Sequence, residues 1–180
     1  MARCVDIESP TLLVFDLDPG EPASIIECCQ VALAIADVLE KVDMVSFAKT
    51  SGSKGMQLYV PLNTPHSHAH ASDFALAVAQ LLEKQRPDAV TANMARKERS
   101  GKIFIDWSQN TRHKTTIAPY SLRGKERPTV STPITWDEVS DGADGEWLGF
   151  EAAEVLDRVD DLGDLWADVP AIEQTLPVGK

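Results

Sequence analysis

The chain has 180 residues, of which 43% are hydrophobic and 25% are charged, and its formal net charge is -11 at pH 7. This length and apolar content suit one compact domain or two small lobes, and they speak against a disordered chain, collagen or a disulfide-stapled miniprotein. An acidic chain also lacks the basic surface that usually marks a simple nucleic-acid-binding protein.

In chain order, the hydrophobic patterns predict a strand over 11–18, a helix over 24–42, strands over 44–48 and 56–62, a loop over 63–71, a second helix N-capped by Ser72, strands over 103–107 and 115–119, and helical pieces over 136–139 and 151–159. Pro22 is expected to open the first helix. The succession of elements contains no internal repeat and predicts an α+β fold, an α/β sandwich with a sheet flanked by helices. We expect residues 1–180 to form one domain, with 140–180 as its acidic C-terminal extension.

Targeting signals and cysteines indicate the compartment. No stretch approaches the ~20 apolar residues of a membrane span, and residues 1–10 lack the apolar centre of a signal peptide. The three cysteines form neither a C-x-x-C motif nor an even disulfide framework. Cys28 and Cys29 are neighbours in a helical pattern and are expected in the core or at its boundary. The sequence therefore predicts a cytoplasmic protein without membrane contact.

The charge is distributed unevenly along the chain. Residues 1–83 carry a net charge of -7, residues 84–127 carry +7, and residues 128–180 carry -11. The basic segment between two acidic flanks is suited to bind phosphate groups, a property that the whole-chain charge hides.

Three aspartates follow apolar runs. Asp16 and Asp18 are two residues apart on a predicted strand, so both carboxylates project from the same face. Asp106 ends a second predicted strand in the same manner. If the three converge, their hard oxygen ligands would hold Mg²⁺ or Mn²⁺ in a two-metal site. The D-x-D pair alone is equally consistent with a role in capping the following turn.

The turn 51–55, Ser-Gly-Ser-Lys-Gly, lies between two predicted strands. Its glycines let backbone N–H groups approach an anion, and its serine hydroxyls and Lys54 add donors and charge. It is a candidate phosphate cradle, although an ordinary hairpin turn is the commoner meaning of such a motif. Arg99 and Arg123 in the basic segment could neutralise a triphosphate or a DNA backbone. Most other cations of that segment are expected to form a solvated surface.

Two further groups of residues favour structural roles. His66, His68 and His70 could chelate a transition metal, but no cysteine or carboxylate stands nearby at ligand spacing, so a surface loop is preferred. The tryptophans of the acidic C-terminal part are expected to pack in the fold rather than to stack on bases; these are Trp136, Trp147 and Trp166.

Four ordered segments together resemble a known family. LVFDLDPGE, KTSGSKGMQLYVPL, FIDWSQN and TTIAPYSLRGKERPTVSTPITWDEV closely resemble the polymerase domain of bacterial ATP-dependent DNA ligase D, a member of the archaeo-eukaryotic primase superfamily. The resemblance runs from about Leu12 to Val139. It implies a primase-type catalytic core with a sheet like that of an RNA-recognition motif. It also implies template-directed transfer of nucleotides from NTP or dNTP to a primer 3′-hydroxyl in bacterial non-homologous end joining, with two metal ions, usually Mn²⁺.

The resemblance also assigns site residues. It implies that Asp16, Asp18 and Asp106 are the catalytic, metal-binding carboxylates. The nucleotide-binding positions that it implies are Ser51, Lys54, Gln57, Arg99, Gln109 and Arg123. In the family the turn normally continues to a histidine where this chain has Gln57, whose neutral amide is a weaker partner for an anion.

The family domain also has an N-terminal module that precedes the D-x-D strand, whereas this chain begins almost at that strand. The resemblance therefore predicts an N-terminally truncated domain. Its expected partners are NTP or dNTP, DNA ends, a ligase, a Ku-type end-binding protein and a separate N-terminal module.

Two other functions are weighed beside this one. The chain could be a catalytically impaired remnant that binds nucleotides or DNA ends, or one half of a split enzyme. It could also be a haloacid-dehalogenase-like phosphatase, because VFDLDPG is similar to that family's opening motif and Gly163-Asp164 with Asp168 to its late acidic motif. The highly charged segment 157–162, where a central strand would be needed, disfavours the phosphatase.

Overall fold

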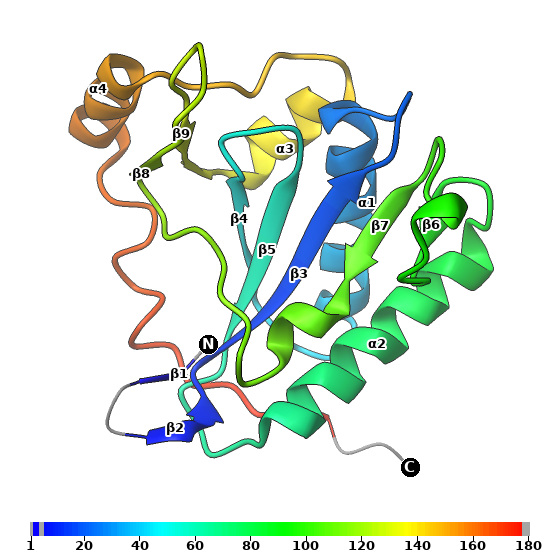
Figure 1. Ribbon diagram of the computed structural model, residues 1–180. Coiled ribbons are helices and arrows are strands. Elements are labelled where there is room, and N and C mark those ends of the chain that lie inside the picture. Colours follow the sequence, from blue (N-terminus) through cyan, green and yellow to red (C-terminus); the bar gives the residue numbers. More distant parts are fainter. Residues whose placement is uncertain (1, 4–5, 178–180) are drawn as a thin grey trace.

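The computed structural model describes residues 2–3 and 6–177 (Figure 1). Its elements are β1 (Ala2–Arg3), β2 (Asp6–Pro10), β3 (Leu12–Pro19), α1 (Ile25–Glu40), β4 (Phe47–Thr50), β5 (Met56–Pro61), α2 (His68–Gln85), β6 (Val90–Thr91), the 3₁₀ turn η1 (Arg96–Glu98), β7 (Ile103–Asp106), the 3₁₀ turn η2 (Trp107–Asn110), β8 (Ser121–Leu122), β9 (Val130–Ser131), β10 (Pro133–Ile134), α3 (Trp136–Ala143) and α4 (Ala152–Leu162).

A six-stranded mixed sheet in the order β10-β4-β5-β3-β7-β6 organises the fold. The central strand β3 runs antiparallel to β5 on one side and to β7 on the other, while β6 is parallel to β7. Strands β3, β4, β5 and β7 with helices α1 and α2 form a β-α-β-β-α-β unit in which β5 and β3 lie between β4 and β7. The α+β expectation is confirmed.

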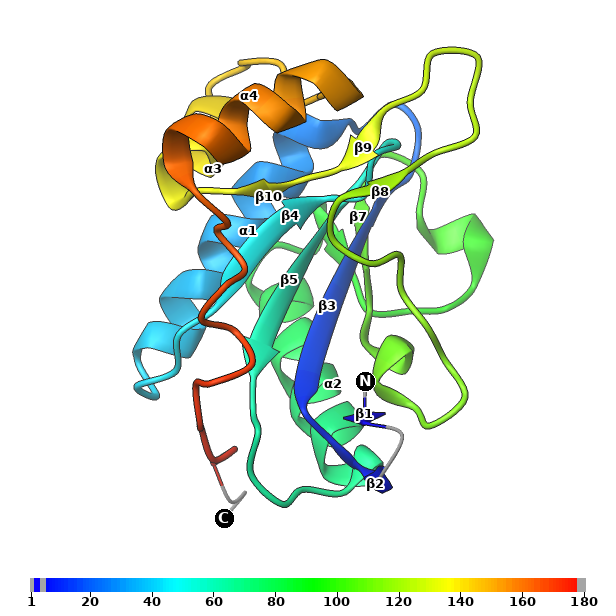
Figure 2. The ribbon, with the colours of Figure 1, turned by 90° about the vertical axis from the view of Figure 1, so that its left-hand side faces the viewer.

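The two faces of this sheet have different surroundings. Along β3, Leu13, Phe15 and Leu17 are fully buried in the hydrophobic core. Since side chains alternate along a strand, Asp16 and Asp18 project from the opposite face. Helices α1 and α2 cover the core face, and the segment 111–129 passes over the other, which we call the open face (Figure 2).

Local capping determines where the helices begin. Ser24 caps α1 in a capping box with Glu27, because its side chain accepts from the backbone while the Glu27 carboxylate accepts from the Ser24 N–H. The expectation that Pro22 opens this helix was therefore wrong. Helix α2 is capped by Ser67 and not by Ser72, so its first turn takes up part of the predicted loop. Cys28 and Cys29 are buried on α1, as expected.

Two predicted strands differ in the structure, for identifiable reasons. Residues 44–46 precede β4 and do not belong to it. The Val45 N–H and carbonyl are hydrogen-bonded by the Gln174 side chain (2.7 and 3.1 Å) and not by a neighbouring strand. Residues 115–119 form no strand. The Thr116 hydroxyl lies 2.7 Å from that of Tyr59, which draws this segment over the open face.

The acidic C-terminal segment packs against the sheet. The Asn63 amide donates to the carbonyls of Val169 and Ile172 (3.0 and 2.7 Å). The Trp166 ring meets the Tyr59 ring in a T-shaped arrangement with 5.1 Å between centroids. Packing of Trp166 is as expected, but Trp147 is 72% exposed and does not pack as expected. None of the helices in the described part of the chain is long and apolar enough to cross a membrane.

Candidate active site

The three predicted carboxylates project from the open face of adjacent strands. Asp16 of β3 lies directly opposite Asp106 of β7 in the sheet register, and Asp18 is opposite Phe104. Asp106 is buried, and its Oδ1 accepts from the backbone N–H of Ser108 (3.0 Å) and from the Ser108 hydroxyl (2.5 Å). The strand register thus places side by side two aspartates that are 90 residues apart in the sequence.

Burial and the closeness of the carboxylates to one another disfavour the ionised forms of Asp16 and Asp18. Burial, and then the charge of Asp18, raises the pKa of Asp16 to about 6, although a hydrogen bond from Gln57 opposes the shift. Desolvation, and then the charge of Asp106, raises the pKa of Asp18, while Arg99 opposes this. The carboxylates therefore repel one another in a partly desolvated place, and a cation would relieve this repulsion.

Two glutamine amides lie against the carboxylates. Gln57 Nε2 donates to Asp16 Oδ1 (2.9 Å), and Gln109 Nε2 lies 3.3 Å from both Asp16 Oδ2 and Asp106 Oδ2. Gln109 Oε1 is buried without a hydrogen-bond partner in the described part of the chain. Among the described residues, no three His, Cys, Asp or Glu side chains are gathered in a geometry that could hold a metal ion. The Gln109 amide bridges two of the carboxylates instead.

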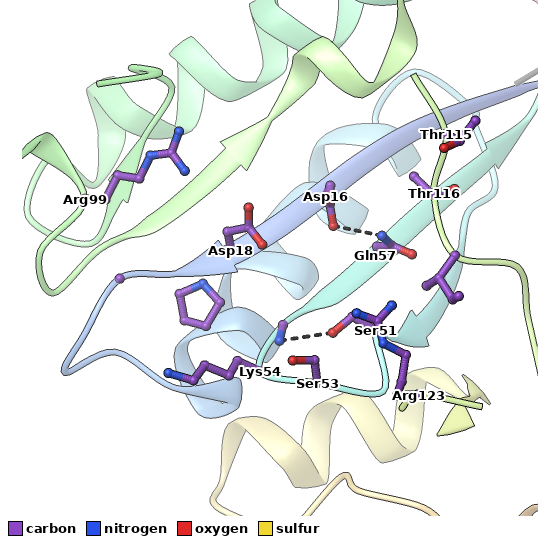
Figure 3. A pocket seen from close by; sticks show the side chains of 14 residues that line it. Asp16, Asp18, Ser51, Ser53, Lys54, Gln57, Arg99, Thr115, Thr116 and Arg123 are labelled. Atoms are coloured by element: carbon purple, nitrogen blue, oxygen red, sulfur yellow. Dashed lines mark hydrogen bonds between the residues drawn. The ribbon is translucent and has the colours of Figure 1, made fainter. Parts of the chain in front are cut away.

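A cavity of about 430 Å³ opens beside Asp16 and Asp18. In Figure 3 these carboxylates lie between Arg99 on one side and the turn 51–55 on the other. Asp106 and Gln109 are not among the lining residues. The cavity brings together most of the predicted site residues, namely Asp16, Asp18, Ser51, Lys54, Gln57, Arg99 and Arg123.

The turn 51–55 closes the β4–β5 hairpin at the rim of the cavity. The Ser51 N–H donates to the Gly55 carbonyl (2.9 Å). A Cβ atom on Gly55 would lie 2.2 Å from the Leu17 carbonyl oxygen, so only glycine allows this approach to β3. The Thr129 hydroxyl donates to the Gly52 carbonyl (2.6 Å), which fastens the β8–β9 hairpin, and with it Arg123, to the turn.

Arg99 lies on the side of the cavity opposite the turn 51–55, where two contacts hold its side chain. Its guanidinium lies over the Phe104 ring, with 3.6 Å between Cζ and the ring centroid, and one terminal nitrogen donates to the Met94 carbonyl (2.8 Å). Arg99 Nε is buried without a hydrogen-bond partner in the described part of the chain. A Cβ atom on Gly20 would lie 1.8 Å from the Arg99 carbonyl oxygen, so Gly20 permits the two loops to touch.

The sequence analysis missed several residues of this network. Lys49 is fully buried and its Nζ donates to Gln57 Oε1 (2.6 Å), while the Tyr59 hydroxyl lies 3.1 Å from the same oxygen. The strand predicted over 44–48 stopped one residue short of Lys49. The available signal was that Lys49 is two residues from Phe47 on the same strand, so that both side chains point to the open face.

The three histidines make hydrogen bonds to backbone groups of other segments. The His66 ring accepts from the Leu176 N–H (3.2 Å), and the ring nitrogens of His68 lie 3.0 and 2.9 Å from the carbonyls of Asn110 and Ile7. His68 and His70 belong to the first turn of α2, so the expected surface loop was only partly correct.

Comparison with known proteins identifies the family. Residues 1–166 match the sequence model described as LigD, primase-polymerase domain. The chain belongs to this family. It is 50% identical over 161 residues to the multifunctional non-homologous end joining protein LigD of Mycolicibacterium smegmatis, covering 89% of this chain and 21% of the relative. The LigD of Pseudomonas aeruginosa is 35% identical over 183 residues, covering 97% and 21%.

A solved structure agrees with this assignment. The polymerase domain from Mycobacterium tuberculosis Ligase D in complex with DNA matches with a TM-score of 0.85 and 46% identity over 92% of this chain and 57% of that chain. The chain thus spans about a fifth of the full-length LigD relatives. Membership of this family leaves the phosphatase interpretation without support. In addition, Asp164 of the supposed late motif accepts a hydrogen bond from Tyr120 (2.6 Å) and does not line the cavity.

Proposed function

We propose that this LigD primase-polymerase domain transfers nucleotides from NTP or dNTP to a primer 3′-hydroxyl, directed by a template strand. The observation that carries the proposal is the direct opposition of Asp16 and Asp106 in the sheet, beside a cavity rimmed by cations and hydroxyls. In the reaction, the 3′-oxygen bonds to the α-phosphorus, and the bond from that phosphorus to the leaving pyrophosphate breaks.

The carboxylates have the donor chemistry for divalent cations. Asp16, Asp18 and Asp106 offer hard oxygen ligands from one face, and their mutual repulsion is what bound Mn²⁺ or Mg²⁺ would offset. When bound, such ions would activate the attacking hydroxyl and stabilise the leaving oxygen. The Gln109 amide, which bridges Asp16 and Asp106, would give up this contact.

The cations around the cavity suit the triphosphate. Lys54 and Arg123 reach it from the turn 51–55 and the β8–β9 hairpin, and the Ser51 side chain lines the same side. Arg99 adds a positive charge on the opposite side. Its buried Nε, which has no partner among the described residues, is a donor that an anionic ligand could satisfy. These groups would hold the triphosphate so that the α-phosphate lies near the carboxylates.

DNA ends are the proposed polymer substrate. Arg99 and Arg123 come from the locally basic segment 84–127, which offers phosphate-binding charge despite the acidic whole. The chain covers 57% of the solved polymerase domain, and we propose that the separate N-terminal module expected from the family resemblance completes the DNA-binding cleft. A ligase and a Ku-type end-binding protein are the proposed partners at the same ends. The site would act in the cytoplasm, at the nucleoid.

Primer extension tests this function. The chain is incubated with a duplex that carries a 3′ overhang, with NTP or dNTP and Mn²⁺ or Mg²⁺. We expect incorporation that is reduced by about 10²-fold or more in Asp16→Asn and in Asp106→Asn. Asp37→Asn is the matched control, because Asp37 is exposed on α1, on the other side of the sheet.

The possible outcomes are distinct. A folded wild-type chain that incorporates nothing, alone and with an added N-terminal module, contradicts the proposal. Metal-dependent nucleotide binding without extension would instead indicate a binding remnant.

A further inference from the structure

Lys49 is a buried amine with no counter-ion in direct contact among the residues that the structure describes. Its side chain on β4 has no exposed surface, and it takes part in none of the ion pairs in the described part of the chain. Its Nζ donates to Gln57 Oε1 and to Ser131 Oγ, each at 2.6 Å, and lies 5.5 Å from the centroid of the Tyr59 ring. Because burying an amine of this kind costs free energy, its position calls for an explanation beyond packing.

The contacts of Lys49 determine the orientation of the Gln57 side chain. Gln57 Oε1 faces two donors, the Lys49 amine and, at 3.1 Å, the Tyr59 hydroxyl. The amide nitrogen cannot take the place of this oxygen, since it would then meet the N–H groups of Lys49. Gln57 Nε2 is therefore directed away from Lys49, toward Asp16 Oδ1 at 2.9 Å.

We propose that Lys49 is a positioning residue for Asp16 and acts through the amide of Gln57. Lys49 fixes the amide, the amide holds Oδ1 of Asp16, and Oδ2 of Asp16 is thereby presented toward β7 and Asp106. The amine also polarises the amide, which strengthens its hydrogen bond to the carboxylate. This role rests on the proposed function, in which Asp16 is a metal ligand.

The electrostatics of the amine agree with this geometry. Burial lowers the pKa of Lys49 to about 7, and the charge of Asp16 opposes that shift. Both the charged and the neutral amine carry N–H donors, so Gln57 Oε1 can accept from Lys49 in either protonation state. The chain through Lys49, Gln57 and Asp16 is therefore maintained across neutral pH.

A double-mutant cycle tests the proposal. Lys49→Met removes the donors at similar volume, and Gln57→Met removes the relay. The readouts are the equilibrium affinity for Mn²⁺, kcat and KM for nucleotide addition, and thermal unfolding. We expect Lys49→Met to weaken Mn²⁺ binding and to lower kcat by about tenfold each, with the nucleotide KM unchanged within about twofold. In the Gln57→Met background, Lys49→Met should have no further effect.

Ser131→Ala is the matched control. It removes the other hydrogen-bond partner of Lys49 and leaves Gln57 in place, so we expect Mn²⁺ affinity within about twofold of wild type. Full additivity of the two methionine substitutions, or an equal loss in Ser131→Ala, would show that Lys49 does not act through Gln57.

Failure of this inference can be told apart from failure of the proposed function. Wild-type protein that binds Mn²⁺ and adds nucleotides, together with an unaffected Lys49→Met, overturns the role of Lys49 alone. Wild-type protein that does neither overturns the proposed function and the role of Lys49 together.

Discussion

The two faces of the central sheet carry opposite chemistry on the same strands. On β3, Phe15 and Leu17 are fully buried against the helices, whereas Asp16, which lies between them in the sequence, faces the cavity. The core face contributes stability through apolar burial. The open face carries Asp16, whose pKa is raised, and Lys49, whose pKa is lowered. Both shifts mean that the charged form of the side chain is disfavoured in the folded state, so this face lowers the stability of the protein. The difference shows that apolar burial on the core face offsets the free energy that the charged groups of the open face cost.

The largest expected effect is on the core face. Phe15→Ala removes a fully buried aromatic ring from the middle of β3 and should lower the free energy of unfolding by about 3–5 kcal/mol. Urea denaturation monitored by circular dichroism measures this. A loss below about 1 kcal/mol would mean that the two faces do not differ as described.

The loop contact beside the open face should be the next most sensitive. In Gly20→Ala the new Cβ would meet the Arg99 carbonyl oxygen, so the loop that carries Arg99 must move. We expect a loss of about 1–3 kcal/mol and reduced nucleotide addition. Gly124→Ala is the control, since a Cβ there has no atom of the other described residues within 4 Å. Equal behaviour of the two variants would show that the loop contact does not position Arg99.

On the open face, substitution of Asp16 should raise the free energy of unfolding. Because the folded-state pKa of Asp16 is raised to about 6, its ionised form costs stability above that pH. Asp16→Asn should therefore stabilise the metal-free protein by about 1–2 kcal/mol at pH 7.5. The gain should vanish near pH 4, where Asp16 is protonated in the folded state. Urea titrations in a chelator at both pH values measure it, and destabilisation at pH 7.5 would contradict this reading of the open face.

The last prediction is a pH dependence of stability that Lys49 causes. Its folded-state pKa of about 7 lies below the ordinary 10.5, so the unfolded chain binds more protons between these values. Stability should therefore rise from pH 7 to pH 9, and this contribution should be absent in Lys49→Met. Above about pH 9, the raised pKa of the Cys28 thiol acts in the opposite direction. Identical slopes in wild type and variant would argue against a charge cost at Lys49.

Much of the site was predictable from local sequence. The alternation along VFDLD placed Asp16 and Asp18 on one face, and the Gly/Ser/Lys turn 51–55 was correctly placed between two strands that form a hairpin. Helix starts were less predictable, since the choice of Ser67 over Ser72 as a cap depends on where α2 packs. The strand expected over 115–119 failed because its hydrophobic pattern reflects contact with the open face and not pairing with a neighbour.

The sequence by itself determined the family to which the chain belongs and which residue types form the candidate site, because motif order and strand alternation are local properties. Only the tertiary structure decided that Asp106 lies opposite Asp16, that Gln109 bridges them and that Lys49 stands behind Gln57. Those relations depend on strand register between segments far apart in the chain. Register is determined when the apolar face of each strand is buried against the helices, and no local pattern contains that information.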